Sequence, residues 1–226
     1  MIELYHIWKQ YQKPDWALTD ISLTIRRGEF CFITGPSGSG KTTLLKIIFR
    51  ELLPTQGQIV VDGMNILKIP NHLIYRLRRT MGIVFQDFRL LYGRRVFDNV
   101  AISLRVLGVA NKETRRRVFN ALRLVNLHHR MWDYPTRLSY GEQQRVAIAR
   151  AIVNEPKIIL ADEPTGNLDP DLAFEIMSLF KEINRRGTTV IICTHDKELI
   201  RNFGERIFFL HKGKLIGKDI LPSSKK

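Results

Sequence analysis

The sequence contains only two cysteines, and this scarcity excludes several kinds of fold and site. Cys31 and Cys193 both lie in apolar, strand-like segments and show no metal-ligand spacing. A disulfide framework and a cysteine-based metal site are therefore not expected. We expect two reduced core thiols, as in a cytosolic protein.

Long apolar segments are also missing. No stretch approaches the roughly 18 apolar residues that a membrane-spanning helix needs. The first residues, Met1–His6, show no basic region followed by an apolar run, so we expect no secretory signal. The 226 residues are 44% hydrophobic, which is enough apolar material for the core of one large domain.

Acidic residues are scarce relative to basic ones. The chain has 22 Asp and Glu against 36 Lys and Arg, a formal net charge of +14. The excess is concentrated between Lys68 and Arg137, where 15 basic side chains accompany four acidic ones. A solvated basic face, a nucleic-acid surface and a surface facing anionic lipid headgroups and a membrane partner all fit this pattern. Charge alone does not choose among them.

The most informative segment that is present fits the pattern G-x-x-x-x-G-K-[ST]. It follows the strand-like residues 30–34 and precedes the helical pattern of residues 43–49, the context that the pattern requires. Glycines bring backbone N–H groups close to a polyphosphate, and the helix N-terminus adds partial positive charge. Lys41 would reach the β- and γ-phosphates, and Thr42 would ligate Mg²⁺. This context disfavours a glycine-rich turn that binds nothing. The expected nucleoside triphosphate site comprises Gly35, Pro36, Ser37, Gly38, Ser39, Gly40, Lys41, Thr42 and Thr43.

Strand-like and helical patterns alternate along most of the chain, which predicts a parallel-rich sheet covered by helices. A helix is expected within residues 111–127 of the basic middle, which we interpret as an inserted subdomain, and another from Ser139 to about Asn154. Strands are expected at residues 21–25, 30–34, 81–85, 157–161, 188–193 and 206–210, and hairpins at Asp62-Gly63 and Lys212-Gly213.

Two carboxylates, Asp162 and Glu163, end the apolar strand predicted at 157–161. The carboxyl edge of a sheet is where ligands of open α/β folds bind. Side chains of successive strand residues point to opposite faces, so the two acids can take different roles. Asp162 would hold Mg²⁺ through water, and Glu163 would polarise the attacking water. The alternative is an acidic helix or turn start, which the phosphate loop makes less favourable.

Residues 138–145 contain Ser139 and, three positions on, Glu142. Locally this pair predicts a capping box at a helix start. A serine hydroxyl with free N–H groups at a helix start also makes an anion site. We interpret it as a site for the γ-phosphate bound to another subunit.

Six motifs occur in the order and spacing of the ATP-binding cassette (ABC) ATPases, so the chain resembles that family over essentially its whole length. They are the phosphate loop, Gln86, Leu138–Glu142, Asp162-Glu163, Asn167–Asp169 and His195. The resemblance implies an α/β P-loop NTPase fold with a RecA-like core, an N-terminal antiparallel β subdomain and an inserted α-helical subdomain. In the implied single ABC ATPase domain, the core with its β subdomain covers residues 1–86 and 155–220, the helical subdomain about 87–154 and a tail 221–226.

The resemblance also implies chemical roles. Thr42, Gln86 and Asp162 would hold Mg²⁺, and Gln86 would also link the core to the helical subdomain. Glu163 would be the general base, and His195 would touch the γ-phosphate. The implied catalytic set is Glu163, His195, Gln86 and Lys41.

Two chains of this family close head to tail, so the resemblance implies a homodimer with two shared ATP molecules. Tyr11 matches the aromatic that stacks on adenine, although Trp8 and Trp16 are nearby alternatives. Residues implied to reach ATP across the dimer are Ser139, Tyr140, Gly141, Glu142 and Asp169. Tyr140 departs from the family, whose signature has a glycine there. Because the Ser139 hydroxyl and the Gly141 backbone remain, we expect ATP binding to survive.

Four segments resemble the cell-division ATP-binding proteins within the family: residues 84–91, 96–101, 115–118 and 161–169. That resemblance implies a polytopic membrane partner and a peripheral place at the cytoplasmic face of the bacterial inner membrane. ATP-driven dimer closure would signal through the partner to cell-wall hydrolases. Relatives that drive lipoprotein release or macrolide efflux look similar at 161–169, so that alternative stays open.

A soluble ABC protein acting on nucleic acid or ribosomes is an alternative of a different class. DNA-repair relatives carry long coiled-coil arms, but only 95 residues separate Thr42 from Leu138, without sustained heptads. Ribosome-acting relatives usually carry two cassettes, and this chain shows one. Nucleic acid is therefore the disfavoured partner, whereas a contact of the basic segment with anionic lipid headgroups stays open.

Overall fold

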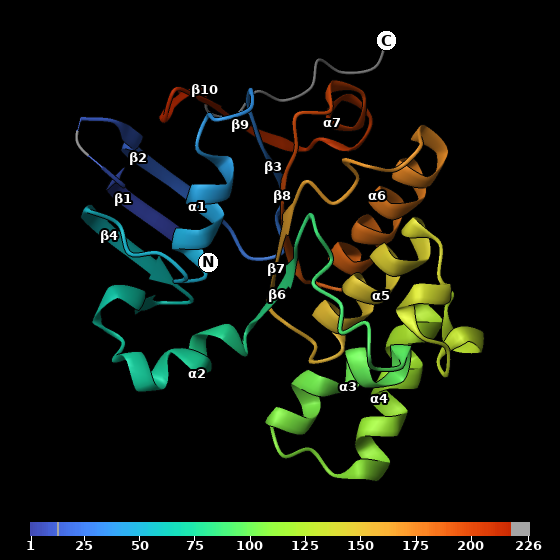
Figure 1. Ribbon diagram of the computed structural model, residues 1–226. Coiled ribbons are helices and arrows are strands. Elements are labelled where there is room, and N and C mark those ends of the chain that lie inside the picture. The colour runs from blue at the N-terminus through green and yellow to red at the C-terminus, as the bar shows by residue number, and fades with distance from the viewer. Residues whose placement is uncertain (13, 218–226) are drawn as a thin grey trace.

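A six-stranded sheet forms the centre of the molecule (Figure 1). The structure, a computed structural model, describes residues 1–12 and 14–217. The strand order is β10-β9-β3-β8-β7-β6; the pairs from β9 to β6 are parallel, and β10 pairs antiparallel with β9. Its strands are β3 (Phe30–Thr34), β6 (Met81–Val84), β7 (Ile158–Asp162), β8 (Thr189–Cys193), β9 (Arg206–His211) and β10 (Lys214–Gly217). The predicted parallel-rich sheet is confirmed.

The central strands β3, β7 and β8 are apolar at all but their end positions, because the sheet is buried on both faces. In β3, Phe30 and Phe32 belong to one buried cluster, whereas Cys31 and Ile33 belong to another. Strands β7 and β8 alternate between the same two clusters. Both cysteines are buried and free, as predicted.

Helices cover one face of this sheet, and the other face packs against α1 and a second sheet (Figure 1). The helices are α1 (Lys41–Ile48), α2 (Ile74–Arg78), α3 (Val96–Val106), α4 (Asn111–Leu124), α5 (Tyr140–Ile152), α6 (Pro170–Arg185) and α7 (Lys197–Phe203). Short 3₁₀ turns lie at Ile66–Lys68, Asn71–Leu73, His128–Arg130 and Pro135–Arg137. Among the described residues, no helix has both the length and the apolar character needed to cross a bilayer. The expected tail at 221–226 lies outside the described residues.

The second sheet is antiparallel, with strand order β2-β1-β4-β5. It contains β1 (Ile2–Gln10), β2 (Trp16–Ile25), β4 (Gln56–Val61) and β5 (Met64–Asn65). Asp62 and Gly63, the predicted hairpin turn between β4 and β5, both have positive φ, 49° and 80°. Two successive positive φ angles suit the twist of a two-residue hairpin.

The sheet topology positions the site. Because β3, β6, β7 and β8 are parallel, the loops that follow them leave the same edge of the sheet. Those loops carry the glycine-rich segment, Gln86, Glu163 and His195, respectively. Residues separated by more than 150 positions in the chain therefore meet at one edge.

Candidate functional site

The glycine-rich loop joins β3 to α1 through two positions that exclude any larger residue. A Cβ at Gly35 would lie 2.0 Å from the Leu210 carbonyl oxygen, and one at Gly40 would lie 2.7 Å from the Ala17 carbonyl oxygen. Gly40 also has a φ of +104° where it caps α1. The loop is therefore compact, and the α1 N-terminus opens into a cleft of about 340 Å³.

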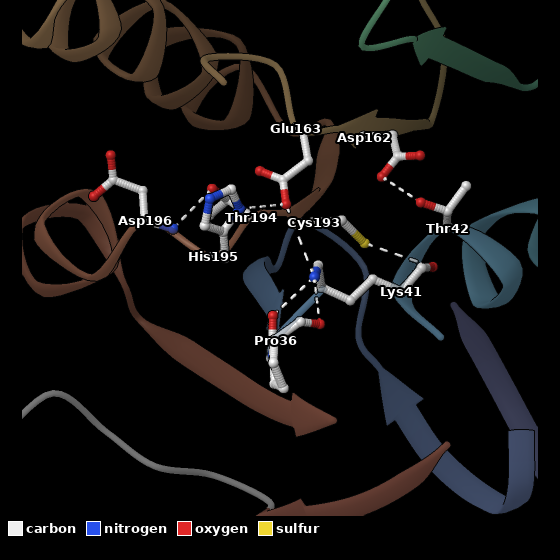
Figure 2. Close-up of polar contacts among 10 residues, drawn as sticks. Pro36, Lys41, Thr42, Asp162, Glu163, Cys193, Thr194, His195 and Asp196 are labelled. Carbon is white, nitrogen blue, oxygen red and sulfur yellow. Dashed lines mark hydrogen bonds and ion pairs between the residues drawn. The ribbon is translucent and has the colours of Figure 1, made fainter. Parts of the chain in front are cut away.

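Lys41 lines this cleft and is only 7% exposed. Its ammonium donates to the carbonyl oxygens of Gly35 (2.8 Å) and Pro36 (3.2 Å) and lies 3.8 Å from Glu163 Oε1 (Figure 2). In this structure the buried ammonium is therefore held by two carbonyl oxygens and by one carboxylate beyond hydrogen-bond distance. Its donors fit a polyphosphate, whose oxygens would make shorter, charge-assisted hydrogen bonds.

The backbone turns out of β7 at Glu163, which has a left-handed φ of 44°. Its N–H donates to the Cys193 carbonyl oxygen of β8 (2.8 Å). Its Oε1 accepts from His195 Nδ1 (2.8 Å), because a carboxylate can only accept (Figure 2). Its Oε2 is buried and bonds no described residue. The side chain therefore has one oxygen fixed and one available.

Asp162 faces a different partner (Figure 2). The Thr42 hydroxyl donates to Asp162 Oδ1 (3.2 Å). Burial raises the pKa of Asp162, and the neighbouring Glu163 carboxylate acts in the same direction, whereas the Thr42 bond opposes them. A bound cation would offset the energetic cost of keeping the Asp162 carboxylate ionised in this buried position. Hydroxyl and carboxylate oxygens are ligands that Mg²⁺ prefers beside substrate phosphates, so the pair fits that ion.

The remaining cleft residues come from several elements. Ser39 Oγ is buried without a partner among the described residues. Gln86 is exposed and follows β6, and the His195 side chain is 69% exposed. The cleft is lined by Ala17, Ser37, Gly38, Ser39, Gly40, Lys41, Thr42, Thr43, Gln86, Glu163 and His195.

Tyr11 lies near the cleft without lining it. Its hydroxyl is 3.2 Å from Thr43 Oγ1, and its side chain is exposed. Trp8 and Trp16 instead pack edge to face on each other, with ring centroids 5.2 Å apart. Of the three aromatics considered for adenine stacking, Tyr11 is the one joined to the glycine-rich loop.

The segment around Ser139 is not brought to this cleft. Ser139 caps α5 in a capping box with Glu142, with bonds of 2.8 and 3.2 Å, as the sequence predicts. Asp169 caps α6 by accepting from the Leu172 N–H (3.0 Å). Residues predicted to act across a dimer do not line the cleft of their own chain: Ser139, Tyr140, Gly141, Glu142 and Asp169.

Sequence reasoning missed a support beneath the loop. The Gly213 N–H, in the turn between β9 and β10, donates to the Ser39 carbonyl oxygen (3.1 Å). A Cβ at Gly213 would lie 2.8 Å from the Ala17 carbonyl oxygen. Cys193 Sγ also lies 3.9 Å from the Lys41 carbonyl oxygen. No local pattern signals these contacts, because a hairpin glycine and a core cysteine are common for other reasons.

Comparison with known proteins agrees with this geometry. The profile of the ABC transporter family matches residues 18–166. The cell division ATP-binding protein FtsE of Bacillus subtilis is 46% identical over 96% of this chain and 95% of its own. The FtsE of Escherichia coli is 46% identical over 96% of this chain and 98% of its own.

Solved structures give the same result. A dimeric, post-hydrolysis structure of the ATP-binding cassette MJ0796, bound to ADP and Pi, has a TM-score of 0.89 and 36% identity, covering 100% of both chains. CbiO1 from Clostridium perfringens, part of the transporter complex cbiONQ, has a TM-score of 0.90 and 34% identity, covering 96% of this chain and 87% of its own. The predicted P-loop NTPase fold is confirmed, and the chain belongs to the ABC transporter family.

Proposed function

We propose that this chain is the ATP-binding and ATP-hydrolysing subunit of a membrane ABC complex of the FtsE–FtsX type. Relatives named cell division ATP-binding protein FtsE align over nearly the whole chain. The proposal that the chain hydrolyses ATP rests on the arrangement of the Glu163 carboxylate. One of its oxygens is held by His195, and the other is buried without a partner at the cleft that Lys41 enters.

In the binding step, Lys41 exchanges its carbonyl contacts for the β- and γ-phosphate oxygens of ATP. The phosphates lie against the N-terminus of α1, where free N–H groups favour anions. Thr42 and Asp162, with Gln86 from the loop after β6, would hold Mg²⁺, which neutralises phosphate charge. Tyr11, beside the loop at Thr43, stacks on adenine.

In the chemical step, Glu163 accepts a proton from the water that attacks the γ-phosphorus. The water oxygen forms the new P–O bond while the bond to the ADP oxygen breaks, giving ADP and phosphate. His195 holds Glu163 Oε1, so the buried Oε2 is the oxygen free to take the proton. A positioned general base of this kind contributes about 10²- to 10⁴-fold to a rate.

The site is complete only in a homodimer. Residues 87–154, as a helical subdomain, present Ser139 and Gly141 to the ATP bound by the partner subunit, and Asp169 communicates across the interface. Two solved structures of the similar cassette MJ0796 are dimeric. Loss of the γ-phosphate removes contacts on both sides and lets the dimer open, a switch set by one phosphate.

The partner that couples closure to work is a polytopic membrane protein of the FtsX type. Closure of the dimer pulls on this partner at the cytoplasmic face of the inner membrane and so controls cell-wall hydrolases outside. At that surface, the basic segment between Lys68 and Arg137 would lie near anionic lipid headgroups, which attract such segments.

Purification from detergent extract tests the proposal. We expect the tagged chain to retain a four-span membrane protein, and the complex to hydrolyse ATP only with Mg²⁺. Glu163→Gln should stop hydrolysis without releasing that partner. Retention of a lipoprotein-release or efflux permease would reassign the partner, and retention of rRNA or DNA would reject the membrane role.

A further inference from the structure

Tyr140 occupies the position where the family signature has a glycine, and its side chain contacts two other loops of the same chain. The ring centroid lies 4.4 Å from that of Phe88, with the rings inclined at 60°. The Tyr140 Oη accepts a hydrogen bond from Asn167 Nδ2 (2.6 Å). A glycine at this position could make neither contact.

The two contacts reach the neighbours of residues assigned to the nucleotide. Phe88 comes two positions after Gln86, and Asn167 comes two positions before Asp169. Tyr140 itself lies directly beside Ser139 at the start of α5. One side chain therefore joins three segments that approach ATP from two subunits.

The segment around Phe88 has a strained backbone. Phe88 and Arg89 both adopt left-handed conformations, with φ of 56° and 49°, which cost energy for residues other than glycine. Arg150, also on α5, donates to the carbonyl oxygens of both residues. Helix α5 thus holds this strained segment from two sites, Arg150 on the backbone and Tyr140 on the buried Phe88 ring.

Packing alone does not account for Tyr140. Its side chain remains 41% exposed, so it buries only part of its own surface. Its hydroxyl, which could bond water at no cost, is instead bonded to Asn167 in the segment that carries Asp169. The hydrogen bond is therefore not needed to satisfy a buried hydroxyl, and it joins the start of α5 to the loop that contains Asn167.

We propose that Tyr140 is a positioning residue that couples the Gln86 loop and the Asp169 loop to the Ser139 segment, so that they align together for hydrolysis. This inference rests on the proposed ATPase function and deepens it. The Tyr140 hydroxyl is bonded to Asn167 of the same chain, and neither these two residues nor Phe88 lines the nucleotide cleft of that chain. Loss of these contacts should lower the fraction of ATP-bound dimers that are aligned for hydrolysis. We therefore expect a lower kcat and an unchanged KM for ATP.

A double-mutant cycle on the complex with its membrane partner tests the coupling. The variants are Tyr140→Phe, which keeps the ring but removes the hydroxyl, Asn167→Ala, and both together. Loss of one such hydrogen bond changes an equilibrium constant by a factor of about 2 to 10. We expect each single variant to lower kcat by about 2- to 10-fold with KM within about 2-fold of the parent. The double variant should be no slower than the slower single one.

Tyr134→Phe is the matched control. Its side chain is 39% exposed, and its hydroxyl bonds no residue in the described part of the chain. We expect this change to leave kcat unaltered. Tyr140→Ala, which also removes the contact with Phe88, should lower kcat further than Tyr140→Phe. Thermal melts should show folded protein for every variant, because Tyr140 and Asn167 lie at the surface.

Two results would overturn the proposal: a double variant whose loss is the product of the single losses, or a Tyr140→Phe enzyme as fast as Tyr134→Phe. A parent complex without Mg²⁺-dependent ATPase activity would reject the proposed function itself, and this inference with it. An active parent with additive variants would reject the coupling alone.

Discussion

Glu163→Gln removes one negative charge from the cleft and leaves the size of the side chain almost unchanged. In the parent, Glu163 Oε1 accepts from His195 Nδ1 at 2.8 Å and lies 3.8 Å from Lys41 Nζ. The glutamine carbonyl oxygen can keep the His195 bond. The amide cannot accept a proton from water, so the base is lost while the geometry is kept.

The expected loss of turnover follows from that chemistry. General-base catalysis contributes about 10²- to 10⁴-fold, which corresponds to about 3–5 kcal/mol in the activation barrier. The affinity for ATP, in contrast, should not fall. The attraction between Lys41 and Glu163 at 3.8 Å is about 4 kcal/mol at an effective dielectric constant of about 20. Its removal frees the ammonium for phosphate, so ATP affinity should be equal or tighter.

Phosphate release at saturating MgATP measures turnover, nucleotide titration measures affinity, and light scattering measures the dimer. We expect turnover at least about 100-fold below the parent, retained ATP binding and an accumulated ATP-bound dimer. Glu198→Gln is the control, because it makes the same change in the exposed first turn of α7. Turnover near the parent rate in Glu163→Gln would show that the base lies elsewhere.

Three further predictions use other parts of the site. Lys41→Ala should weaken ATP binding by about 10- to 100-fold, since a charged hydrogen bond contributes about 1.5–3 kcal/mol, and unchanged affinity by titration would refute its assignment. Burial raises the pKa of Asp162, so its charged form destabilises the fold above the folded pKa; Asp162→Asn should raise the nucleotide-free Tm at pH 7. This gain should vanish below about pH 3, where the parent carboxyl is protonated in both the folded and the unfolded state, because the unfolded pKa is about 3.9. A pH-independent gain would contradict that cause. In Gly35→Ala, the new Cβ would lie 2.0 Å from the Leu210 carbonyl oxygen, a backbone atom that cannot rotate away, so overpacking should cost about 1–3 kcal/mol by denaturant titration. Gly93→Ala, where a Cβ meets nothing within 4 Å, is its control, and equal stabilities would exclude the clash.

Contiguous motifs made much of this protein predictable. The loop from Gly35 to Thr42 needs closely spaced glycines before a helix, and the Asp62-Gly63 turn needs two positive φ angles. Each of these conformations depends only on residues that are neighbours in the chain, so it can be predicted from a short stretch of sequence. The apolar strands and the capping box at Ser139 are local in the same way, and all of these elements occur in the structure. Element ends differ by a few residues; α5 stops at Ile152 and not near Asn154.

Sequence reasoning was less accurate where a side chain depends on distant backbone. Regular strand alternation would place Asp162 and Glu163 on opposite faces of one strand. Strand β7 instead ends at Asp162, and Glu163 turns into a left-handed conformation fixed by a hydrogen bond to Cys193. No residue near Glu163 encodes that bond, because its acceptor lies on β8.

The sequence by itself determined that the chain has a phosphate loop, a pair of carboxylates and a helix start carrying Ser139, because each is a short pattern with local physical requirements. Only the tertiary structure decided which of these groups meet. The parallel order of β3, β8, β7 and β6 brings Lys41, Glu163 and His195 to one edge of the sheet and leaves Ser139 outside their cleft. That order is set by burial of both sheet faces, a property of the whole chain that no single segment contains.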